Sequence, residues 1–388
     1  MKILQVSKPV LPVRPDMKYG GVERVVRDLD QEFVRQGHES FVVAPADSIV
    51  SGTLIPSTNR GAWTKKDPIS YDERSKAKAV ERHTRKVIQA ISEIKPDVVH
   101  DHLPLLMQRR YLESGLRVPT LTTLHGALQS ENGMSSIPNP TPEVVNLWNN
   151  FAAISESQRA FFSAVLPVGY MIHNAIRTKD YPFEPEKRDY LLSLGKIGLN
   201  KGQETAIKVA RRLGKKLVIA GPVHAFRDPI QDYWKTKVEP NIDEFHLDIP
   251  TDQINEFTEK LQRRGAGREG LVIYVGEVDD AQKKEWYRYA SGFSMPIRWH
   301  EPFGLVMIEA MSTGTPVVAY NMGAVPEIVI NGRTGYVVQA ENIEQFTEAT
   351  RNLEKIDPRR TRDHIVRNFD IKRQAERYIE AFQSIISA

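Results

Sequence analysis

Short apolar runs alternate with helix-like segments along the whole chain. Five runs lie in its first part: "KILQVS", "SFVVAP", "DVVH", "TLTTLH" and "FAAIS". A helical pattern over residues 22–36 follows the first run, and Gly37 can end it. Six more runs follow: "YLLSLG", "KLVIAG", "LVIYVG", "GFSMPI", "PVVAY" and "GYVV". Strands that alternate with helices are typical of parallel sheets covered on both faces. The pattern therefore predicts an α/β chain with two doubly wound domains facing each other across a cleft.

The apolar pattern is interrupted once, at "HNAIRTKDYPFEPEKRD", where prolines and charges gather. We place the domain linker there, which assigns residues 1–178 to an N-terminal domain and residues 179–370 to a C-terminal domain. The last helical stretch, residues 371–388, is expected to join the N-terminal domain. A length of 388 residues agrees with two domains, since single cores usually stop growing at about 250–300 residues.

Composition describes an ordinary globular protein, with 40% hydrophobic and 26% charged residues. No run of about 18 apolar residues exists, and Lys8 and Pro9 interrupt the first strand too early for a signal peptide. We therefore expect a cytoplasmic protein. The absence of cysteine excludes disulfides, thiolate metal ligands and cysteine nucleophiles.

The formal net charge of +4 is small for a nucleic-acid-binding protein. Lys and Arg (53) are nearly balanced by Asp and Glu (49), and no basic arm is present. We expect no nucleic-acid partner, whereas a phosphate-bearing small molecule needs only a few cations. The basic helical region "ERSKAKAVERHTRKVIQAIS" has two interpretations, docking on anionic lipid at the inner face of the membrane or a solvated helix face. Its interspersed acidic residues favour the solvated face.

Glu309 is a single carboxylate in the apolar segment "LVMIEAM", which we expect to be helical over residues 304–312. A buried carboxylate is costly unless it is hydrogen-bonded. The helix start at "PFGL" presents backbone N–H groups to an anion, and Glu309 lies roughly 7.5 Å further along the helix. Glu309 could thus accept hydrogen bonds from ribose hydroxyls while Glu301 lies near the group that the diphosphate carries. Alternatively, Glu309 reaches solvent and Glu301 is an ordinary loop charge.

Two other motifs resemble binding sites. "GAGREG", residues 265–270, has the spacing of a dinucleotide fingerprint, but it follows a helical stretch and precedes a strand, the reverse of the required order. We therefore assign no dinucleotide site there. "HDH", residues 100–102, has two histidines, but no Cys/His spacing nearby completes a metal site. We favour structural or site-lining roles and predict no metal.

The residues around Glu309 resemble a known family. "EPFGLVMIEAM", with its two glutamates eight positions apart, is similar to the E-x7-E signature of retaining, nucleotide-sugar-dependent glycosyltransferases of family 4. The segments "TGTPVVAYNMGAVPEIVINGRTGYVV", "YGGVERVV" and "TLHG" resemble further motifs of that family. The resemblance spans most of the chain. It implies the GT-B fold, two Rossmann-like domains with the donor bound mainly to the second and the acceptor mainly to the first.

The resemblance implies a role for each matching residue of the second domain. Glu309 matches the glutamate that holds the donor ribose, and Glu301 matches the one that contacts hydroxyls of the transferred sugar. The backbone amides that meet the sugar and phosphate are implied to belong to Phe303, Gly304 and Leu305.

The first domain contributes three further matches. Gly20 and Gly21 match first-loop glycines that let backbone approach the diphosphate, although any strand-to-helix turn can contain such a pair. His125 matches a histidine near the reacting sugar, although a single histidine at a strand end is more often structural.

The family commonly places an arginine and a lysine after the first strand of the second domain, where "GKIGLNK" has Lys196 and Lys201. Lys201 matches directly. Lys196 keeps the charge of the arginine but not the bidentate fork that grips phosphate. The implied catalytic residues are therefore His125, Glu301 and Lys201, with the lysines and the helix start stabilising the leaving diphosphate without a metal.

The reaction that the resemblance implies is hexosyl transfer from a nucleotide-sugar to an acceptor hydroxyl, with retention of configuration and with no cofactor beyond the nucleotide-sugar co-substrate. A UDP-sugar is favoured on frequency alone, with a GDP-sugar as the alternative. The acceptor is a small molecule, a glycan or a lipid-linked molecule. Two other classes stay open: a GT-B-fold epimerase or phosphorylase, and a non-catalytic sugar-nucleotide-binding protein.

Overall fold

The structure is a computed structural model that describes residues 1–9, 11–17, 20–59, 73–103, 113–126, 150–223, 232–265, 267 and 269–388. It divides into two compact units, Met1–Ala175 with Ile371–Ala388, and Ile176–Asp370. The expected boundaries were 178/179 and 370/371. The first crossing thus comes three residues earlier in the structure, and the second comes at the expected residue.

The first unit contains a seven-stranded parallel sheet with the order β3-β2-β1-β4-β5-β6-β7. Its strands are β1 (Lys2–Val6), β2 (Glu39–Ala44), β3 (Thr53–Pro56), β4 (Val98–Asp101), β5 (Thr120–Leu124), β6 (Phe151–Ala153) and β7 (Tyr170–Met171). The five strands predicted from apolar runs are present. The edge strands β3 and β7 were not predicted, because they are short and incompletely buried.

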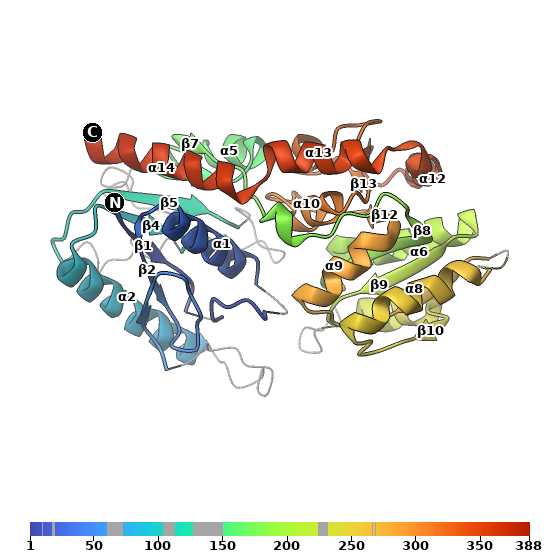
Figure 1. Ribbon diagram of the computed structural model, residues 1–388, viewed down its shortest axis with the longest axis horizontal. Helices are drawn as coiled ribbons and strands as arrows, with labels where there is room; N and C mark the ends of the chain where they lie inside the picture. Colours follow the sequence, from blue (N-terminus) through green and yellow to red (C-terminus); the bar gives the residue numbers. More distant parts are fainter. Residues whose placement is uncertain are drawn as a thin grey trace. The chain divides into compact units, whose positions relative to one another are not determined.

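Helices of the first unit are α1 (Gly21–Arg35), α2 (Glu73–Ile94), α5 (Glu156–Phe162) and α14 (Ile371–Ser387). The terminal helix α14 packs against α1 and β5, and Figure 1 shows it running alongside α1. Buried apolar side chains join these layers, because α1 and α14 each present an apolar face to the sheet. The chain thus returns to its N-terminal unit after completing the second one.

The second unit contains another seven-stranded parallel sheet, with the order β10-β11-β9-β8-β12-β13-β14. Its strands are β8 (Arg188–Leu194), β9 (Lys216–Ala220), β10 (Glu244–Phe245), β11 (Leu271–Tyr274), β12 (Ala290–Met295), β13 (Val317–Tyr320) and β14 (Gly335–Val338). All but the two-residue β10 were predicted. The α/β class with two doubly wound domains is therefore confirmed.

Helices connect strands of this sheet, and two more follow its last strand. They are α6 (Gln203–Leu213), α8 (Ile254–Arg263), α9 (Asp280–Tyr289), α10 (Leu305–Ser312), α11 (Val325–Ile328), α12 (Ile343–Arg351) and α13 (Pro358–Asn368). The central helix α10 packs against both α9 and α13, which explains why its sequence has no polar face. The glycines of "GAGREG" lie between α8 and β11, so the order is helix then strand and the dinucleotide fingerprint is excluded.

Each sheet has one point where the direction of chain winding reverses. In the first unit the chain runs outward from β1 to β3 and then returns to place β4 on the other side of β1. In the second unit the reversal falls between β8 and β12. Ligands of doubly wound sheets bind at the carboxyl ends of the strands at such a reversal, so these two positions are where functional side chains are expected.

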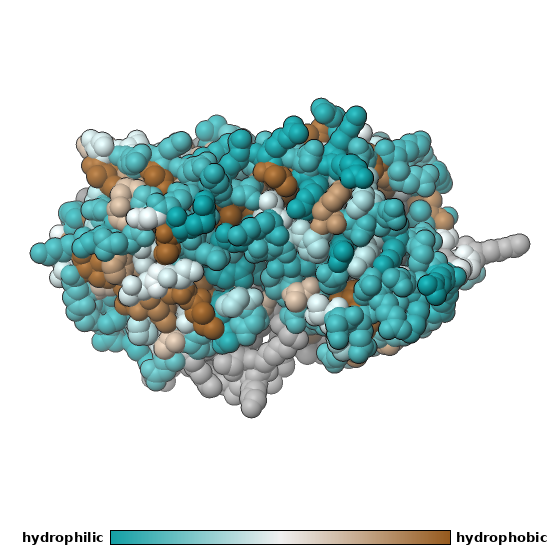
Figure 2. Space-filling view, in the orientation of Figure 1, coloured by the Kyte–Doolittle hydropathy of each residue, from teal (hydrophilic) through white to brown (hydrophobic). Residues whose placement is uncertain are grey.

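The surface agrees with the composition. On the face shown in Figure 2, hydrophilic residues predominate and hydrophobic residues form small scattered groups. Within the part of the chain that the structure describes, no helix is both long and apolar enough to cross a bilayer.

Candidate active site

Two loops meet at the reversal point of the second sheet. One joins β8 to α6 and the other joins β12 to α10. The N–H of Arg298 donates to the carbonyl of Asn200 (2.8 Å), and a Cβ on Gly202 would collide with the carbonyl oxygen of Pro296. Gly202 has φ 70°, in the left-handed region that favours glycine. The two loops are therefore held in close contact by their backbones.

Lys201 and Glu301 are brought together by these loops. Lys201 Nζ lies 3.0 Å from Glu301 Oε2, and the indole Nε1 of Trp299 donates to the same oxygen (2.9 Å). The lysine ammonium also lies 4.8 Å from the centre of the Trp299 ring, within range of a cation–π interaction. Two residues implied to be catalytic, 100 positions apart in sequence, thus form a partly buried ion pair.

The start of α10 follows directly. Gly304 caps the helix with φ 96°, in the left-handed region that favours glycine. A Cβ at this position would also crowd the side chains of Met307 and Glu301. Phe303 is buried against Phe369, which anchors the preceding turn. The first turn of α10, from Leu305, carries no acidic side chain. No carboxylate of this turn therefore competes with an anion for its N–H groups and for the positive end of the helix dipole. Such a helix start can bind a phosphate.

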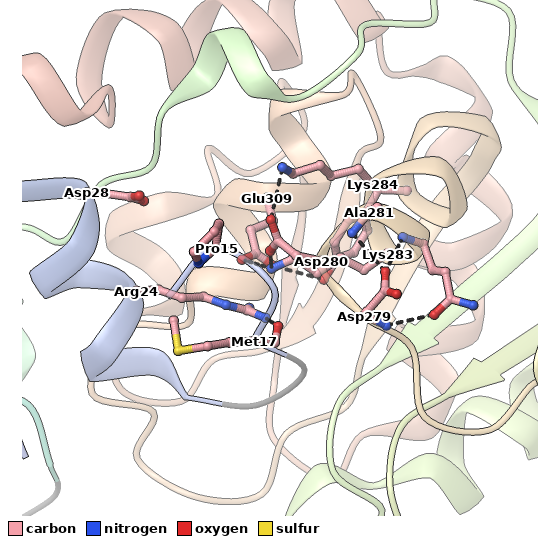
Figure 3. Close-up of polar contacts among 12 residues, drawn as sticks. Pro15, Met17, Arg24, Asp28, Asp279, Asp280, Ala281, Lys283, Lys284 and Glu309 are labelled. Atoms are coloured by element: carbon pink, nitrogen blue, oxygen red, sulfur yellow. Dashed lines mark hydrogen bonds and ion pairs between the residues drawn. The ribbon is translucent and has the colours of Figure 1, made fainter. Parts of the chain in front are cut away.

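Glu309 is 2% exposed, so the interpretation in which it reaches solvent is wrong. Its Oε1 accepts from Lys283 Nζ (2.6 Å) and its Oε2 from the hydroxyl of Tyr287 (3.3 Å). Lys283 also lies 3.0 Å from Asp280, which bridges to Lys284 at the same distance. Figure 3 shows this group, with the lysines on α9 and Glu309 on α10. A buried carboxylate is thus compensated by a buried cation, as its burial requires.

The sequence of α9 explains how these partners reach Glu309. The Asp279 side chain caps the helix by accepting from the N–H groups of Ala281 and Gln282. The Gln282 side chain in turn accepts a hydrogen bond from the Asp279 N–H. Lys283 and Tyr287 are four positions apart on the helix and therefore share one face. The capping box fixes where the helix begins and hence which face packs against α10.

A third loop, after β13, supports Glu301 through its backbone. The N–H of Ala324 donates to the Glu301 carbonyl (2.9 Å), and a Cβ on Gly323 would collide with the Glu301 backbone. The segment "NMGAVPEI", which resembles the family continuation, therefore fixes the position of the first glutamate.

Lys196 lies in the same loop as Lys201 and is half buried. Its carbonyl accepts from the side chain of Gln203 (3.0 Å), which ties the loop to the start of α6. The phosphate contact expected of its ammonium group stays a prediction.

The reversal point of the first sheet contains the other predicted residues. Gly20, with φ 127°, caps α1, and Gly21 is the first residue of that helix. Glu23 in the first turn is buried, and burial raises the pKa of its carboxyl while the charge of Lys8 opposes that rise. The preceding loop is tied to α1 by Arg24, whose Nη2 donates to the carbonyl of Met17 (3.0 Å; Figure 3). A close approach of diphosphate to the two glycines stays a prediction.

His125 lies beside two other histidines. Its Nε2 is 2.9 Å from His102 Nδ1, and the centres of the His100 and His102 rings are 3.9 Å apart. His100 continues the cluster through Thr123, whose hydroxyl lies 3.1 Å from that of Tyr378 on α14. Among the described residues, no group of three or more His, Asp or Glu side chains is arranged to hold a metal. His100 lies in β4 and His102 follows the last residue of that strand. The structural or site-lining role of the "HDH" histidines, the expectation that no metal binds there, and the role of His125 near the sugar stay predictions.

Burial keeps the histidine cluster neutral. Desolvation lowers the pKa of His102 to about 3, and it lowers the pKa of His100 and His125 well below the ordinary value of 6.5. His83, buried beside Ser57, has its pKa lowered to about 4 for the same reason. At neutral pH these rings can share hydrogen bonds without carrying charge.

This burial predicts that the first unit loses stability in mild acid. The folded-state pKa values lie below the unfolded value, so the stabilisation is complete above about pH 6.5 and is lost as the pH falls towards 3–4. Each such histidine adds a slope of up to about 1.4 kcal/mol per pH unit. Hydrogen exchange of amides in β1 and β4 between pH 7 and 5 measures the effect, and His102→Gln should reduce the slope. A profile that does not change over this range would contradict the prediction.

Three side chains at these sites were missed by the sequence analysis. Trp299, Lys283 and Arg298 each contact a predicted residue or its loop. Lys283 and Lys284 are adjacent, and the sequence contains no signal for which of the two side chains turns inward. Arg298 is anchored by Glu204 (2.7 Å) and Thr205 (3.0 Å), partners about 94 positions away.

Two family models match the chain in succession. The family described as Glycosyltransferase Family 4 matches residues 19–180, and that described as Glycosyl transferases group 1 matches residues 177–369. The first match contains the first-loop glycines and the histidine cluster. The second contains both lysines, both glutamates and the start of α10.

Curated relatives are similar over parts of the chain. A D-inositol 3-phosphate glycosyltransferase of Streptomyces avermitilis is 38% identical over 24% of this chain and 21% of that protein. The lipopolysaccharide core biosynthesis mannosyltransferase LpsB of Rhizobium meliloti is 31% identical over 34% and 38%. A glycogen synthase of Mycobacterium tuberculosis is 24% identical over 91% and 86%. The chain therefore spans less than two thirds of the first two proteins and most of the third.

Solved structures are similar over the full length. AviGT4, a glycosyltransferase involved in avilamycin A biosynthesis, superimposes with a TM-score of 0.67 at 21% identity, covering 100% of this chain and 99% of that one. Anabaena HepE in complex with UDP-glucose gives a TM-score of 0.67 at 17% identity, covering 99% and 100%. These similarities show the fold, which is the GT-B fold that the sequence implied.

Proposed function

Because the chain belongs to glycosyltransferase family 4, we propose that it transfers a hexose-type sugar from a nucleoside-diphosphate donor to an acceptor hydroxyl, with retention of configuration and without a metal. The observation that carries the proposal is the meeting of Lys201, Glu301 and the start of α10 at the reversal point of the second sheet. The GT-B fold alone hosts several activities, so the proposal depends on this site.

The donor contacts follow from the chemistry of each group. The N–H groups at the start of α10 and the ammonium groups of Lys196 and Lys201 bind the diphosphate. Glu309, roughly 7.5 Å along the helix, accepts from the ribose hydroxyls, and Glu301 accepts from hydroxyls of the transferred sugar. Reaction breaks the bond between the anomeric carbon and a phosphate oxygen and forms a bond between that carbon and the acceptor oxygen, whose proton passes to the leaving diphosphate. Positive charge then develops on the sugar and negative charge on the leaving diphosphate, which the cations and the helix start stabilise.

We favour a UDP-sugar as donor, with a GDP-sugar as the alternative. HepE, one structural neighbour, is described in complex with UDP-glucose, and another, a starch synthase of Arabidopsis thaliana, is described bound to ADP. The acceptor is a small molecule, a glycan or a lipid-linked molecule. Thermal-shift measurements with UDP, GDP and ADP identify the base, since a ligand at 100 times its dissociation constant stabilises by about 2.7 kcal/mol.

Product analysis with the donor so identified tests the reaction. A transferase consumes the donor in proportion to an added acceptor, whereas an epimerase converts the sugar without one and a binding protein releases nothing. Donor turnover that ignores every acceptor would contradict the proposal.

The two glutamates should fail in different ways. Glu309→Gln should weaken binding of free UDP by about tenfold, because a charged acceptor to two hydroxyls contributes more than a neutral one. Glu301→Ala should lower turnover by about 100-fold and change the binding of free UDP little, since UDP lacks the sugar that Glu301 contacts. Calorimetry and steady-state kinetics separate the two effects. If both variants bind UDP and transfer sugar like the parent, the assignment is wrong.

A further inference from the structure

Glu301 shares one oxygen between two donors of different character. Its Oε2 accepts from Lys201 Nζ (3.0 Å) and from the indole Nε1 of Trp299 (2.9 Å). The lysine is a flexible cation, and the tryptophan is a neutral donor whose ring has two rotatable bonds. The ammonium also lies over the indole face at 4.8 Å. The three side chains are therefore in mutual contact.

A bound donor changes the balance among them. The inference rests on the proposed function, in which Lys201 binds the donor diphosphate. That group carries more negative charge than one carboxylate and gains charge as it leaves, so it attracts the ammonium away from Glu301. Once Lys201 moves, Trp299 is the remaining side chain, among the described residues, that donates a hydrogen bond to Glu301.

The backbone around Trp299 suits that task. Its neighbour Arg298 donates its N–H to Asn200, and the Arg298 guanidinium binds Glu204 (2.7 Å) and Thr205 (3.0 Å) on α6. The residue before Trp299 is therefore held at two places, at the loop between β8 and α6 and at α6 itself. Lys201, by contrast, ends a four-carbon stem that can change partner.

We propose that Trp299 is a positioning residue that holds Oε2 of Glu301 when Lys201 turns to the donor diphosphate. The carboxylate then keeps one orientation towards the transferred sugar through the reaction. This makes Trp299 a determinant of donor-sugar selectivity, because a fixed acceptor distinguishes hydroxyl epimers that a mobile one does not.

The test is Trp299→Phe, which keeps an aromatic face for Lys201 and removes the N–H donor. We expect turnover to fall by about tenfold, binding of free UDP to stay at the parental value, and the preference between UDP-glucose and UDP-galactose to shrink. Trp234→Phe is the matched control, since that ring packs on Tyr274 in the core of the same unit and should leave the preference unchanged. In a Glu301→Ala background, Trp299→Phe should have little further effect on turnover.

Tryptophan fluorescence reports the change of partner directly. UDP titrated into the parent should change the emission as the ammonium leaves the Trp299 ring, and this component should be missing in Trp299→Phe. If Trp299→Phe keeps the parental turnover and the parental preference between UDP-glucose and UDP-galactose, the inference is wrong. It is also wrong if the variant loses UDP binding and turnover equally. Neither result contradicts the proposed function. A parent that binds no nucleotide and transfers no sugar would overturn the proposed function and the inference together.

Discussion

Replacing Lys283 by methionine is expected to lower the free energy of unfolding of the second unit by about 3–5 kcal/mol, because it leaves a buried carboxylate without its nearest cation. Lys283 Nζ lies 2.6 Å from Glu309 Oε1, and both side chains are 3% exposed. The loss corresponds to a fall in melting temperature of about 10 °C for a domain of this size. Thermal and urea denaturation measure it.

Lys284→Met is the matched control. Lys284 follows Lys283 on α9 and lies 3.0 Å from Asp280, but it is 21% exposed and carries no contact with Glu309 among those described. We expect a change below about 1 kcal/mol. The double variant Lys283→Met with Glu309→Met should recover much of the stability, since it removes both buried charges. Equal effects of the two lysine variants would show that the Lys283–Glu309 pair contributes nothing specific.

Replacing Lys201 by alanine is expected to lower turnover by about 10²–10³-fold while free UDP binding weakens by less than about tenfold. The reason is that the diphosphate gains negative charge as the bond to the anomeric carbon breaks, so the cation contributes most in the transition state. The ion pair with Glu301 makes the difference larger, because Lys201 must exchange one anion for another when the donor binds.

Single-turnover kinetics and calorimetry separate the two quantities. Lys208→Ala removes an exposed lysine of α6 and should leave both unchanged. If Lys201→Ala transfers sugar at the parental rate, the diphosphate is neutralised elsewhere, and the loop from Lys196 to Lys201 is a structural turn.

Periodicity alone was sufficient for most of the fold. Buried parallel strands are continuous apolar runs, so eleven strands were readable from sequence. The helix of Glu309 was expected over residues 304–312 and spans Leu305–Ser312. The missed strands β3, β7 and β10 are short edge strands in which no residue is fully buried, so they lack the continuous apolar run that marks a buried strand.

The candidate site was predictable where a motif was contiguous. Glu301, the start of α10 and Glu309 lie within nine residues, and helical geometry fixes the distance from the helix start to Glu309. Lys201 was identified only by resemblance to the family, because the local sequence "GLNKG" does not indicate which other loop the lysine side chain contacts. Its pairing with Glu301 required the order β9-β8-β12, and strand order is not encoded in local periodicity.

The sequence by itself thus determined the class of fold, the two domains, and the contiguous part of the site, since these depend on interactions between neighbours along the chain. Tertiary structure alone decided that Glu309 is buried against Lys283 rather than exposed to solvent, and that Trp299 and Lys201 share one oxygen of Glu301. Each of these depends on which helix face or loop packs against another. Which surfaces pack together depends on the strand order and on the burial of apolar side chains throughout the unit. No single segment of the sequence contains this information.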